Sequence, residues 1–556
     1  MAAALRAIAA PLLGLPRLAL PLLLAIAAAV PLLWAGLAAV AAGFDATAWR
    51  ALLGDPQWPR ALAHSVFTGL AATALGVLAT AWILSRAFAA APWRFVVRTL
   101  APMLAMPHAA FAIGLAFLLA PSGWILRALS PWATGFELPP DWPTTQDPWG
   151  FGLVLALLGK EIPFLLWVAA SQLQRADAGA RWARELELAR TMGYTRSAAW
   201  WRVVWPQLWP RLGAPVLAVG AYSLTVVDVA LVIGPASPPT ASVLAWQWLL
   251  DADPGINAKG AAAAWLLAAV AAALAGAFWL LRPRLRRRSL WSDGIRGRRE
   301  TSAARGFAGP TVLACVYLLV MLALALGSVS GVWLFPAFWP QNLSLGGWRS
   351  VFGSMDTVWT TLGLAGASSL TALVWAVLWL EAAPARWDLH MRRIAYLPLL
   401  LPSILWVVGL HRLALAWQVD GEWLGLWIGH TLAALPYMLI ALSPSYLDFD
   451  VRYRHVAASL GRGRLAFLLR VKWPLLRAGL WSALAVGFSV SVAQYLPTLF
   501  VGAGRFATVT TEAVALASGG QRSVLAAYAW LQWLLPAAGF ALAAWMGRPR
   551  RFGKPS

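Results

Sequence analysis

A hydrophilic stretch of this chain occurs twice, at residues 184–212 and again at 452–480. The two copies align without a gap, and eleven aligned positions are identical. The identical pairs are Arg184/Arg452, Ala189/Ala457, Gly193/Gly461, Arg196/Arg464, Ala198/Ala466, Arg202/Arg470, Val203/Val471, Trp205/Trp473, Pro206/Pro474, Leu208/Leu476 and Leu212/Leu480. An internal repeat of this kind indicates that both halves of the chain share one architecture.

Long apolar runs fill most of the remaining sequence. Charged residues make up 12% of the chain, whereas a soluble domain has about 25%. About 20 apolar residues span a bilayer, and about twelve such spans are predicted, the first of them a retained helix and not a cleaved signal. They lie at about 18–43, 62–88, 97–120, 150–172, 212–234, 259–281, 309–332, 357–380, 394–417, 422–444, 479–502 and 523–546. We therefore expect an all-α membrane protein with about 12 transmembrane helices.

A basic segment divides these spans into two sets of six. Residues 282–306 hold nine Arg against two acidic residues and contain no apolar run, which is typical of a cytoplasmic linker. We expect a first half at 1–281 with its core at about 60–281, a linker at 282–308, and a second half at 309–556 with its core at about 355–547.

The charges of the loops predict the orientation of the chain. Arginines gather between spans 2 and 3, 4 and 5, 8 and 9, and 10 and 11, in the linker and at the C-terminus, whereas the alternate loops hold few. Basic loops face the cytoplasm, so both termini and both repeated stretches are expected there. Two halves of equal orientation form a parallel repeat. The net charge of +22 is then explained by this bias, so membrane lipid and not nucleic acid is the expected partner.

Two further pairs of segments extend the repeat. Span 3 has Pro107 seven residues before Gly114, and span 9 has Pro402 seven residues before Gly409. The start of span 2, at residues 64–68, likewise aligns with 356–360. The shared core is therefore expected to comprise spans 2–6 and 8–12.

The repeated stretch predicts two helices with a turn between them. In the first copy, residues 181–192 lack Gly and Pro, and Gly193 follows as the expected C′ residue. Thr195 or Ser197 then caps a second helix, which Pro206 is expected to disrupt because proline lacks an N–H. Such a unit between two spans is a candidate lever that a soluble partner moves. The alternative is an amphipathic helix that lies on anionic lipid.

The first helix of each copy also has a candidate N-cap residue. Asp177 is the candidate in the first copy, and Asp448 or Asp450 in the second. The second copy then repeats the pattern, with Gly461 as the turn and Pro474 as the disrupting residue.

The first copy resembles the EAA loop of ABC-importer permeases. The motif runs from Glu187 to Gly193, with Trp200 seven residues later, Pro206 thirteen residues after Gly193 and Pro210 four further on. Both halves resemble type I transmembrane domains fused in one chain, as in bacterial permeases for thiamine and ferric iron.

This resemblance implies the partners and the residues of the coupling site. Each loop would form a coupling helix that docks on one of two copies of a separate ATPase, and an external or periplasmic binding protein would deliver the substrate. The coupling positions are then Glu187, Ala189, Gly193, Trp200 and Pro206 in the first copy, and His455, Ala457, Gly461, Phe467 and Pro474 in the second. His455 replaces the Glu of the motif and Ala478 replaces its second Pro, so the two loops are expected to couple unequally.

The chain itself shows no pattern for ATP hydrolysis, catalysis, or cofactor or metal binding. A phosphate-binding loop has four residues between its glycines and then Lys-Ser or Lys-Thr. The nearest match has six residues between Gly152 and Gly159, and Glu161 follows Lys160. We therefore expect no enzyme activity in this chain and an ATPase on another polypeptide.

Polar residues within spans are costly and therefore suggest function. The candidates for a translocation path are Lys160, Glu161, Ser223, Asp228, Ser489, Ser491 and Gln494. For Lys160 and Glu161, the alternative is a buried ion pair or hydrogen bond between helices.

Taken together, the sequence predicts the permease subunit of a binding-protein-dependent ABC importer in a bacterial cytoplasmic (inner) membrane. The alternative is an ion-coupled secondary transporter with twelve helices. The loops favour the importer, because an ion-driven carrier needs no lever for an ATPase.

Overall fold

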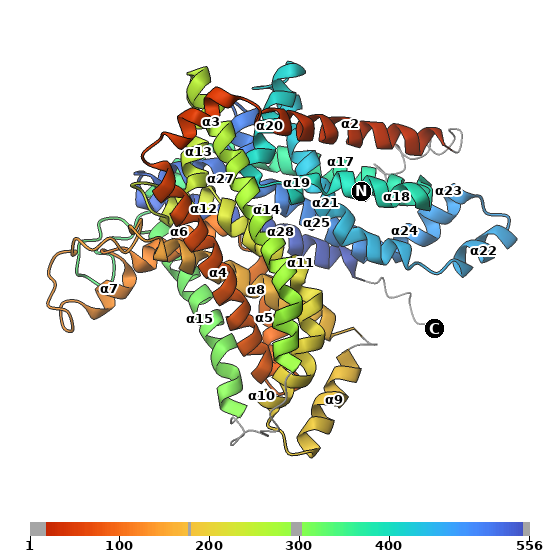
Figure 1. Cartoon of the computed structure of the whole chain (residues 1–556), viewed down its shortest axis with the longest axis horizontal. Helices are drawn as coiled ribbons and strands as arrows, with labels where there is room; N and C mark the ends of the chain where they lie inside the picture. Colours follow the sequence, from red (N-terminus) through yellow and green to blue (C-terminus); the bar gives the residue numbers. More distant parts are fainter. Residues whose placement is uncertain (1–17, 176–178, 291–302, 549–556) are drawn as a thin grey trace. The chain divides into compact units, whose positions relative to one another are not determined.

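The computed structural model describes residues 18–175, 179–290 and 303–548 (Figure 1). Within these ranges the regular elements are helices, apart from isolated β-bridges between Ala236 and Pro239 and between Ser330 and Leu343. The prediction of an all-α membrane protein is therefore confirmed.

Contacts divide the chain into two compact units, and neither unit is continuous in sequence. The first, here called the α17 unit, comprises the described parts of Met1–Phe44, Gly353–Glu512 and Leu531–Ser556. The second, the α4 unit, comprises the described parts of Asp45–Phe352 and Ala513–Trp530. The helix α2 (Ala19–Ala41), the first of the described helices, therefore groups with helices from the second half of the sequence.

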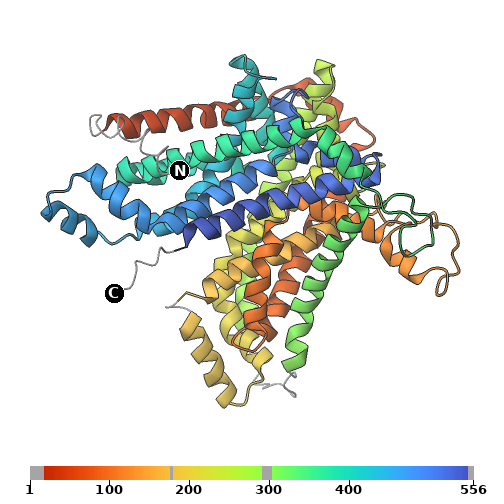
Figure 2. The same cartoon turned by 180° about the vertical axis from the view of Figure 1, so that it is seen from behind.

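The α17 unit is built around α17, which packs on α21 and α25 (Figure 2). Its helices are α2 (Ala19–Ala41), α17 (Met355–Ala382), α18 (Ala385–Ala395), α19 (Leu397–Leu400), α20 (Ser403–Ala416), α21 (Trp423–Leu447), α22 (Arg452–Ser459), α23 (Arg464–Phe467), the π-helix η2 (Leu468–Lys472), α24 (Trp473–Leu475), α25 (Arg477–Val492) and α26 (Leu496–Val501). The division between units runs through α27 (Val509–Ala517) and α28 (Arg522–Gly547).

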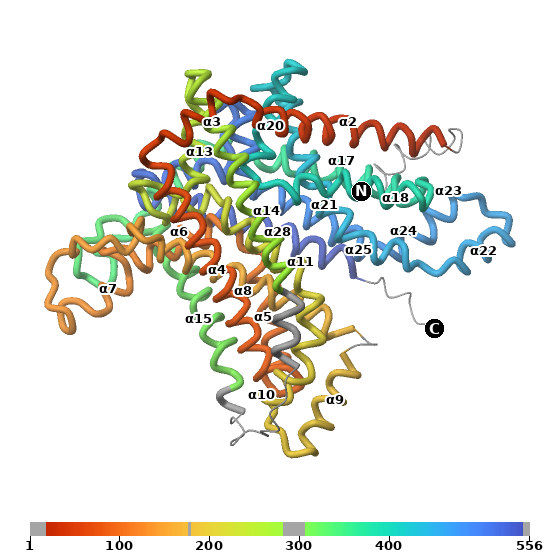
Figure 3. Tube along the Cα trace, in the orientation of Figure 1, coloured from red at the N-terminus to blue at the C-terminus, as the bar shows by residue number. Residues whose placement is uncertain are grey.

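The α4 unit is built around α4, which packs on α8 and α11 (Figure 3). Its helices are α3 (Ala46–Leu53), α4 (Trp58–Ala87), α5 (Trp93–Ala105), α6 (His108–Leu119), α7 (Trp124–Leu129), α8 (Phe151–Leu173), α9 (Gly179–Thr191), α10 (Arg196–Ala199), the π-helix η1 (Trp200–Val204), α11 (Trp205–Thr225), α12 (Asp228–Ile233), α13 (Ala241–Leu249), α14 (Pro254–Leu290), α15 (Ala303–Ser328) and α16 (Gly346–Gly353). The residues between α14 and α15, which hold the centre of the expected linker at 282–308, lie outside the described residues.

The first helix of each half packs at a repeated glycine of the other half. In the α17 unit, α2 packs on α20, and a Cβ on Gly409 would overlap the carbonyl oxygen of Ala35. In the α4 unit, α15 packs on α6, and a Cβ on Gly114 would lie 2.6 Å from a side-chain carbon of Val320. The repeated Pro-to-Gly spacing therefore marks two equivalent helix crossings. The halves expected at 1–281 and 309–556 were drawn from the repeat along the chain. The contact-defined units differ from these halves, because α2 packs in the α17 unit and α15 packs in the α4 unit.

Nine described helical segments are long and apolar enough to cross a membrane, or ten when one bent pair is counted as a single span. The predicted spans 5, 9 and 11 are the three that have no segment among these nine. Each is interrupted, as is span 3, which breaks between α5 and α6. Span 5 is split between α11 and α12, span 9 into α18, α19 and α20, and span 11 into α25 and α26. A hydropathy window averages across such breaks and reads them as continuous helices.

Candidate coupling loops and intramembrane polar residues

The first loop lies between α8 and α11 and has the predicted helix–turn–helix form. Gly193 follows α9 with φ of +90°, a left-handed conformation that suits glycine. Its N–H donates to Arg190 at 2.9 Å, and the N–H of Tyr194 donates to the carbonyl of Ala189 at 3.1 Å. These two bonds form a Schellman motif. Thr195, and not Ser197, caps the next helix by accepting from the backbone N–H of Ala198 at 3.3 Å.

The second loop repeats this turn with different residues around it. Gly461 has φ of +68° and donates to Ala458 at 2.9 Å, and the N–H of Arg462 donates to the carbonyl of Ala457 at 2.9 Å. Ala189 and Ala457 are both buried and accept the equivalent bond. The alignment of the two sequences therefore corresponds to one backbone geometry that occurs twice.

Asp450 holds the start of the second loop helix. Its carboxylate accepts from the backbone N–H of Arg452 at 2.8 Å and from the side-chain Nε at 2.7 Å. The side-chain hydrogen bond from Arg452 is the main reason that the pKa of Asp450 is lowered below its ordinary value. Asp448 instead ends α21 as its C-cap residue. Asp177, the cap candidate of the first loop, lies outside the described residues.

The expectation that Pro206 disrupts the helix was wrong. The chain passes from α10 through η1 into α11, and Pro206 lies in the first turn of α11. Within η1 the N–H of Trp205 donates to Trp200, five residues earlier. The wider π turn accommodates a residue that has no N–H to donate. The second loop has the same feature, since Trp473, before Pro474, donates to Leu468.

The two loops differ in how they join the following helix. In the first loop, α11 continues through Pro210 and Pro215. In the second, the helical segments 464–475 and 477–492 meet at 74°, and Leu476 between them has non-helical dihedral angles. Ala478, the departure from the family motif, follows directly after this bend.

The expected coupling residues have two different environments. Ala189, Trp200, Pro206, Ala457 and Phe467 are buried, whereas Glu187, Gly193, His455, Gly461 and Pro474 are exposed. Trp200 is fully buried in the core of the α4 unit, and Phe467 lies in the core of the α17 unit. These two aromatic residues therefore anchor the loops to the helices beneath them and offer no surface to a partner.

Two exposed apolar pairs were missed by the sequence reasoning. Leu188 is 64% exposed and Met192 63%, and the aligned residues Val456 and Leu460 are 58% and 71% exposed. Each pair is spaced i, i+4, with its first residue in the helix and its second directly after the last helical residue, so both lie near one side of the helix end. The sequence did contain a signal for these pairs: two apolar residues four positions apart occur at aligned positions in both copies of an otherwise polar stretch.

Equivalent arginines anchor the first loop at the end of α4 and the second loop at the end of α17. Arg196 donates to the carbonyls of Phe88 and Ala89, at 3.2 and 2.7 Å, just past the end of α4. Arg464 donates to the carbonyl of Glu381 at 2.7 Å, near the end of α17. The alignment of span 2 with span 8 pairs Ala89 with Glu381. All three bonds satisfy carbonyls at or just past a helix end, where the chain leaves them without an intrahelical donor.

The carboxylate near this arginine comes from a different place in each loop. In the first, Glu187 of α9 accepts from Arg190 at 3.0 Å and lies 3.8 Å from Arg196. In the second, where His455 replaces that Glu, the carboxylate of Glu381 lies 3.2 Å from Arg464 and 2.9 Å from Lys472. The charge missing from the second motif is therefore supplied by α17.

Lys160 and Glu161 lie next to each other in α8 but have different neighbours. The ammonium group of Lys160 donates to the carbonyls of Met103, at 2.8 Å, and Met106. These carbonyls lie at the end of α5, where Pro107 separates α5 from α6. Lys160 thus donates hydrogen bonds to two backbone carbonyls at the point where span 3 is interrupted. Oε1 of Glu161 has no hydrogen-bond partner among the described residues and lies 4.0 Å from Nε2 of His108.

The other path candidates lie near two helix interruptions. In the α4 unit, Ser223 is buried near the end of α11, and the half-buried Asp228 starts α12. In the α17 unit, Ser489 donates to Ala485 within α25, and Gln494 is half-buried in the break before α26.

Ser491 is part of a buried polar network in the α17 unit. It lies 3.0 Å from the hydroxyl of Ser368 and 2.8 Å from Nδ1 of His430. Nε2 of His430 lies 3.0 Å from the hydroxyl of Thr498. The sequence reasoning did not include His430, because it is a single histidine within an apolar helix.

The fold, the spans and the repeated loops define a helical multi-pass membrane protein with two related halves. No protein-family model matches the chain. The chain is 37% identical over 528 residues to the inner membrane ABC transporter permease protein YnjC of Escherichia coli (strain K12), and the match covers 93% of this chain and 94% of that protein. The chain therefore belongs to the family of inner membrane ABC transporter permeases.

Proposed function

We propose that this permease is the membrane subunit of a binding-protein-dependent importer and that its two loops couple transport to two copies of a separate ATPase. Family membership supports the permease role. The observation that carries the coupling role is the exposed apolar pair of each loop, Leu188 with Met192 and Val456 with Leu460. Such pairs suit the apolar centre of a docking interface.

The anchoring of the loops supports their use as levers. The Arg196 bonds attach the first loop to the end of α4, and the Arg464 bonds attach the second to the end of α17. The buried Trp200 and Phe467 add packing beneath each loop. A displacement of a loop therefore moves the attached helices with it. Glu187, Ala189, Gly193 and Pro206, with His455, Ala457, Gly461 and Pro474, shape the loops around the docking pairs.

The proposed orientation places both loops and both termini in the cytoplasm, since basic residues concentrate there. Lys160, Glu161, Ser223 and Asp228, with Ser489, Ser491 and Gln494, are the proposed polar lining or support of the path. The proposed substrate is a small solute that the binding protein selects, with thiamine and ferric iron as the first ligands to test.

The docking proposal is tested by charge substitutions on the full-length permease, purified with its ATPase. Burial of a leucine-sized side chain contributes about 1.5–3 kcal/mol, so Leu188→Asp and Val456→Asp are each expected to weaken ATPase binding at least about tenfold. Leu53→Asp is the matched control, because Leu53 is 69% exposed in α3 and outside both loops. Unchanged ATPase binding in both loop variants would rule out these docking pairs.

The energy source is tested with the permease in liposomes. We expect uptake to require the ATPase, ATP and the binding protein. Uptake that needs no second subunit and follows a proton gradient would instead identify the alternative, an ion-coupled secondary transporter. Substrate identity is tested separately, by thermal-shift screening of the binding protein with thiamine, ferric iron and other small solutes.

A further inference from the structure

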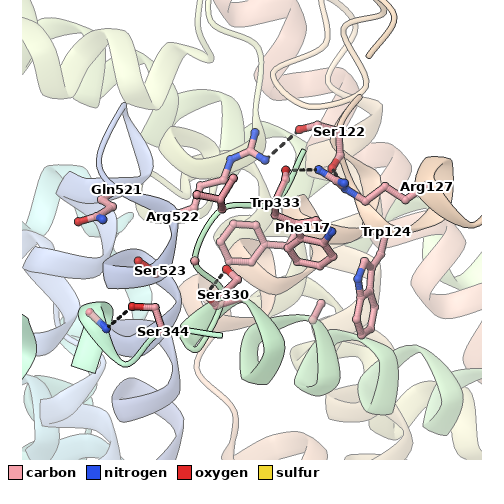
Figure 4. Close-up of a pocket in the computed structure, with 15 residues that line it drawn as sticks. Phe117, Ser122, Trp124, Arg127, Ser330, Trp333, Ser344, Gln521, Arg522 and Ser523 are labelled. Carbon is pink, nitrogen blue, oxygen red and sulfur yellow. Dashed lines mark hydrogen bonds between the residues drawn. The ribbon is translucent and has the colours of Figure 1, made fainter. Parts of the chain in front are cut away.

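The α4 unit contains a cavity of about 470 Å³ that is distant in sequence from both loops. Its walls come from the junction of α6 and α7, the end of α15, the segment after α15, and the start of α28 (Figure 4). The lining includes Phe117, Ser122, Trp124, Arg127, Trp333 and Arg522, and no carboxylate of the described residues is part of it.

Arg127 is a buried charge on one wall of this cavity, with 4% of its surface exposed. Its guanidinium donates to four backbone carbonyls: Ser122 at 2.8 Å, Leu334 at 2.8 Å, Ala337 at 2.8 Å and Trp333 at 3.0 Å. These bonds use four of the five N–H donors of the guanidinium, and three of them hold the segment after α15. They leave its positive charge without a negative partner, since carbonyl groups are dipoles and carry no net charge.

Arg522 brings a second positive charge to the same place. It is the first residue of α28, and its side chain donates to the hydroxyl of Ser122 at 2.9 Å. Ser122 therefore lies between the two arginines, accepting from Arg127 through its carbonyl and from Arg522 through its hydroxyl (Figure 4). Among the described residues, neither Arg127 nor Arg522 lies within ion-pair distance of a carboxylate.

Three aromatic side chains also line the cavity, and one of them has an unused donor. Phe117, Trp124 and Trp333 line the cavity, and the rings of Trp124 and Trp333 contact edge to face with centroids 6.2 Å apart. The indole Nε1 of Trp124 is buried and has no hydrogen-bond partner among the described residues. A buried indole N–H usually has a partner, so the cavity lacks an acceptor at this point.

We propose that this cavity binds a phosphate group, carried by a phospholipid or present as a free anion. Phosphate supplies the negative charge that the two arginines lack and several acceptor oxygens for donors on different walls. Arg522 binds the phosphate directly. Arg127 contributes charge and positions the wall, and the indole of Trp124 donates a further hydrogen bond.

The test uses the full-length permease and two phosphate sources. In one arm, thermal stability is measured in detergent as phosphatidylglycerol is added, with phosphate-free diacylglycerol for comparison. In the other arm, inorganic phosphate is compared with chloride at equal ionic strength. Stabilisation by phosphatidylglycerol alone identifies a lipid site, and stabilisation by inorganic phosphate identifies a site for a free anion. Stabilisation by neither overturns the proposal.

Variants connect any stabilisation to the cavity. A hydrogen bond to a charged group contributes about 1.5–3 kcal/mol, so Arg522→Gln is expected to weaken phosphate binding about tenfold or more. Trp124→Phe keeps the aromatic wall and removes the donor, and is expected to weaken binding less. Arg349→Gln is the matched control, because Arg349 is exposed in α16 and outside the cavity lining. Equal binding by Arg522→Gln and the control would also overturn the proposal.

Discussion

Arg464 and Glu381 are joined twice, through the backbone carbonyl of Glu381 at 2.7 Å and through its carboxylate at 3.2 Å. The same carboxylate lies 2.9 Å from Lys472 and accepts from the hydroxyl of Tyr446 at 3.0 Å. One acidic residue at the end of α17 therefore connects the second loop to α17 and α21. It places a negative charge beside the loop arginine Arg464, as Glu187 does beside Arg196 in the first loop.

We expect Glu381→Gln to destabilise the second loop. Glu381 and Lys472 each have side chains that are 14% exposed, and removal of one partner leaves the other charge partly buried. The expected loss of stability is about 2–3 kcal/mol, somewhat below that of fully buried pairs. The measurement is thermal unfolding of the purified permease together with ATPase stimulation.

A double-mutant cycle separates the ion pair from other effects of this substitution. Glu381→Gln combined with Lys472→Met is expected to be less destabilising than the sum of the two single changes, because the second change removes the unpaired charge. Strict additivity would show that Glu381 and Lys472 do not interact energetically.

Gly461→Ala is expected to cost about 1–2 kcal/mol, because Gly461 has φ of +68° and an L-residue is strained in that conformation. No atom lies within 4 Å of a Cβ added there, so the cost comes from the backbone alone. Asparagine tolerates the left-handed region, and Gly461→Asn should therefore lose less stability in the same unfolding assay. A similar loss for both variants would contradict this explanation.

Gly409→Ala should separate α2 from α20, because the added Cβ would overlap the carbonyl oxygen of Ala35. Overpacking costs about 1–3 kcal/mol, and a backbone obstacle has little freedom to move. Gly366→Ala in α17 is the control, since no atom lies within 4 Å of its Cβ. That change is expected to stabilise the helix by about 0.5–1 kcal/mol. Both unfolding temperatures are measured in detergent, and a stable Gly409→Ala variant would contradict the close crossing.

Lys160→Met is expected to lower stability by about 1–3 kcal/mol, because it removes the donor to the carbonyls of Met103 and Met106. Glu161→Gln is the adjacent control and should change stability less, since Oε1 of Glu161 has no hydrogen-bond partner among the described residues. Unfolding temperature and uptake per folded molecule are both measured. A normal unfolding temperature with lost uptake would instead favour a direct role for Lys160 in the path.

The local geometry of the loops followed closely from the sequence. Gly193 and Gly461 marked the turns, because glycine after a helix adopts the left-handed conformation at low cost. Thr195 was one of two cap candidates, and the structure selects it. The prolines were misjudged, since the π turns before Pro206 and Pro474 depend on hydrogen bonds five residues apart that local propensity does not indicate.

The sequence by itself determined the helical class, the position of most spans, and the existence of two related halves. These properties depend on apolar length and on residues close together in the chain. Only the tertiary structure decided that α2 joins the second half and α15 the first, and that Glu381 supplies the carboxylate that the second loop lacks. The grouping of the helices and the contact of Glu381 both depend on residues far apart in the chain that meet only when the helices pack. Residue spacing along the chain does not indicate which helices will pack together.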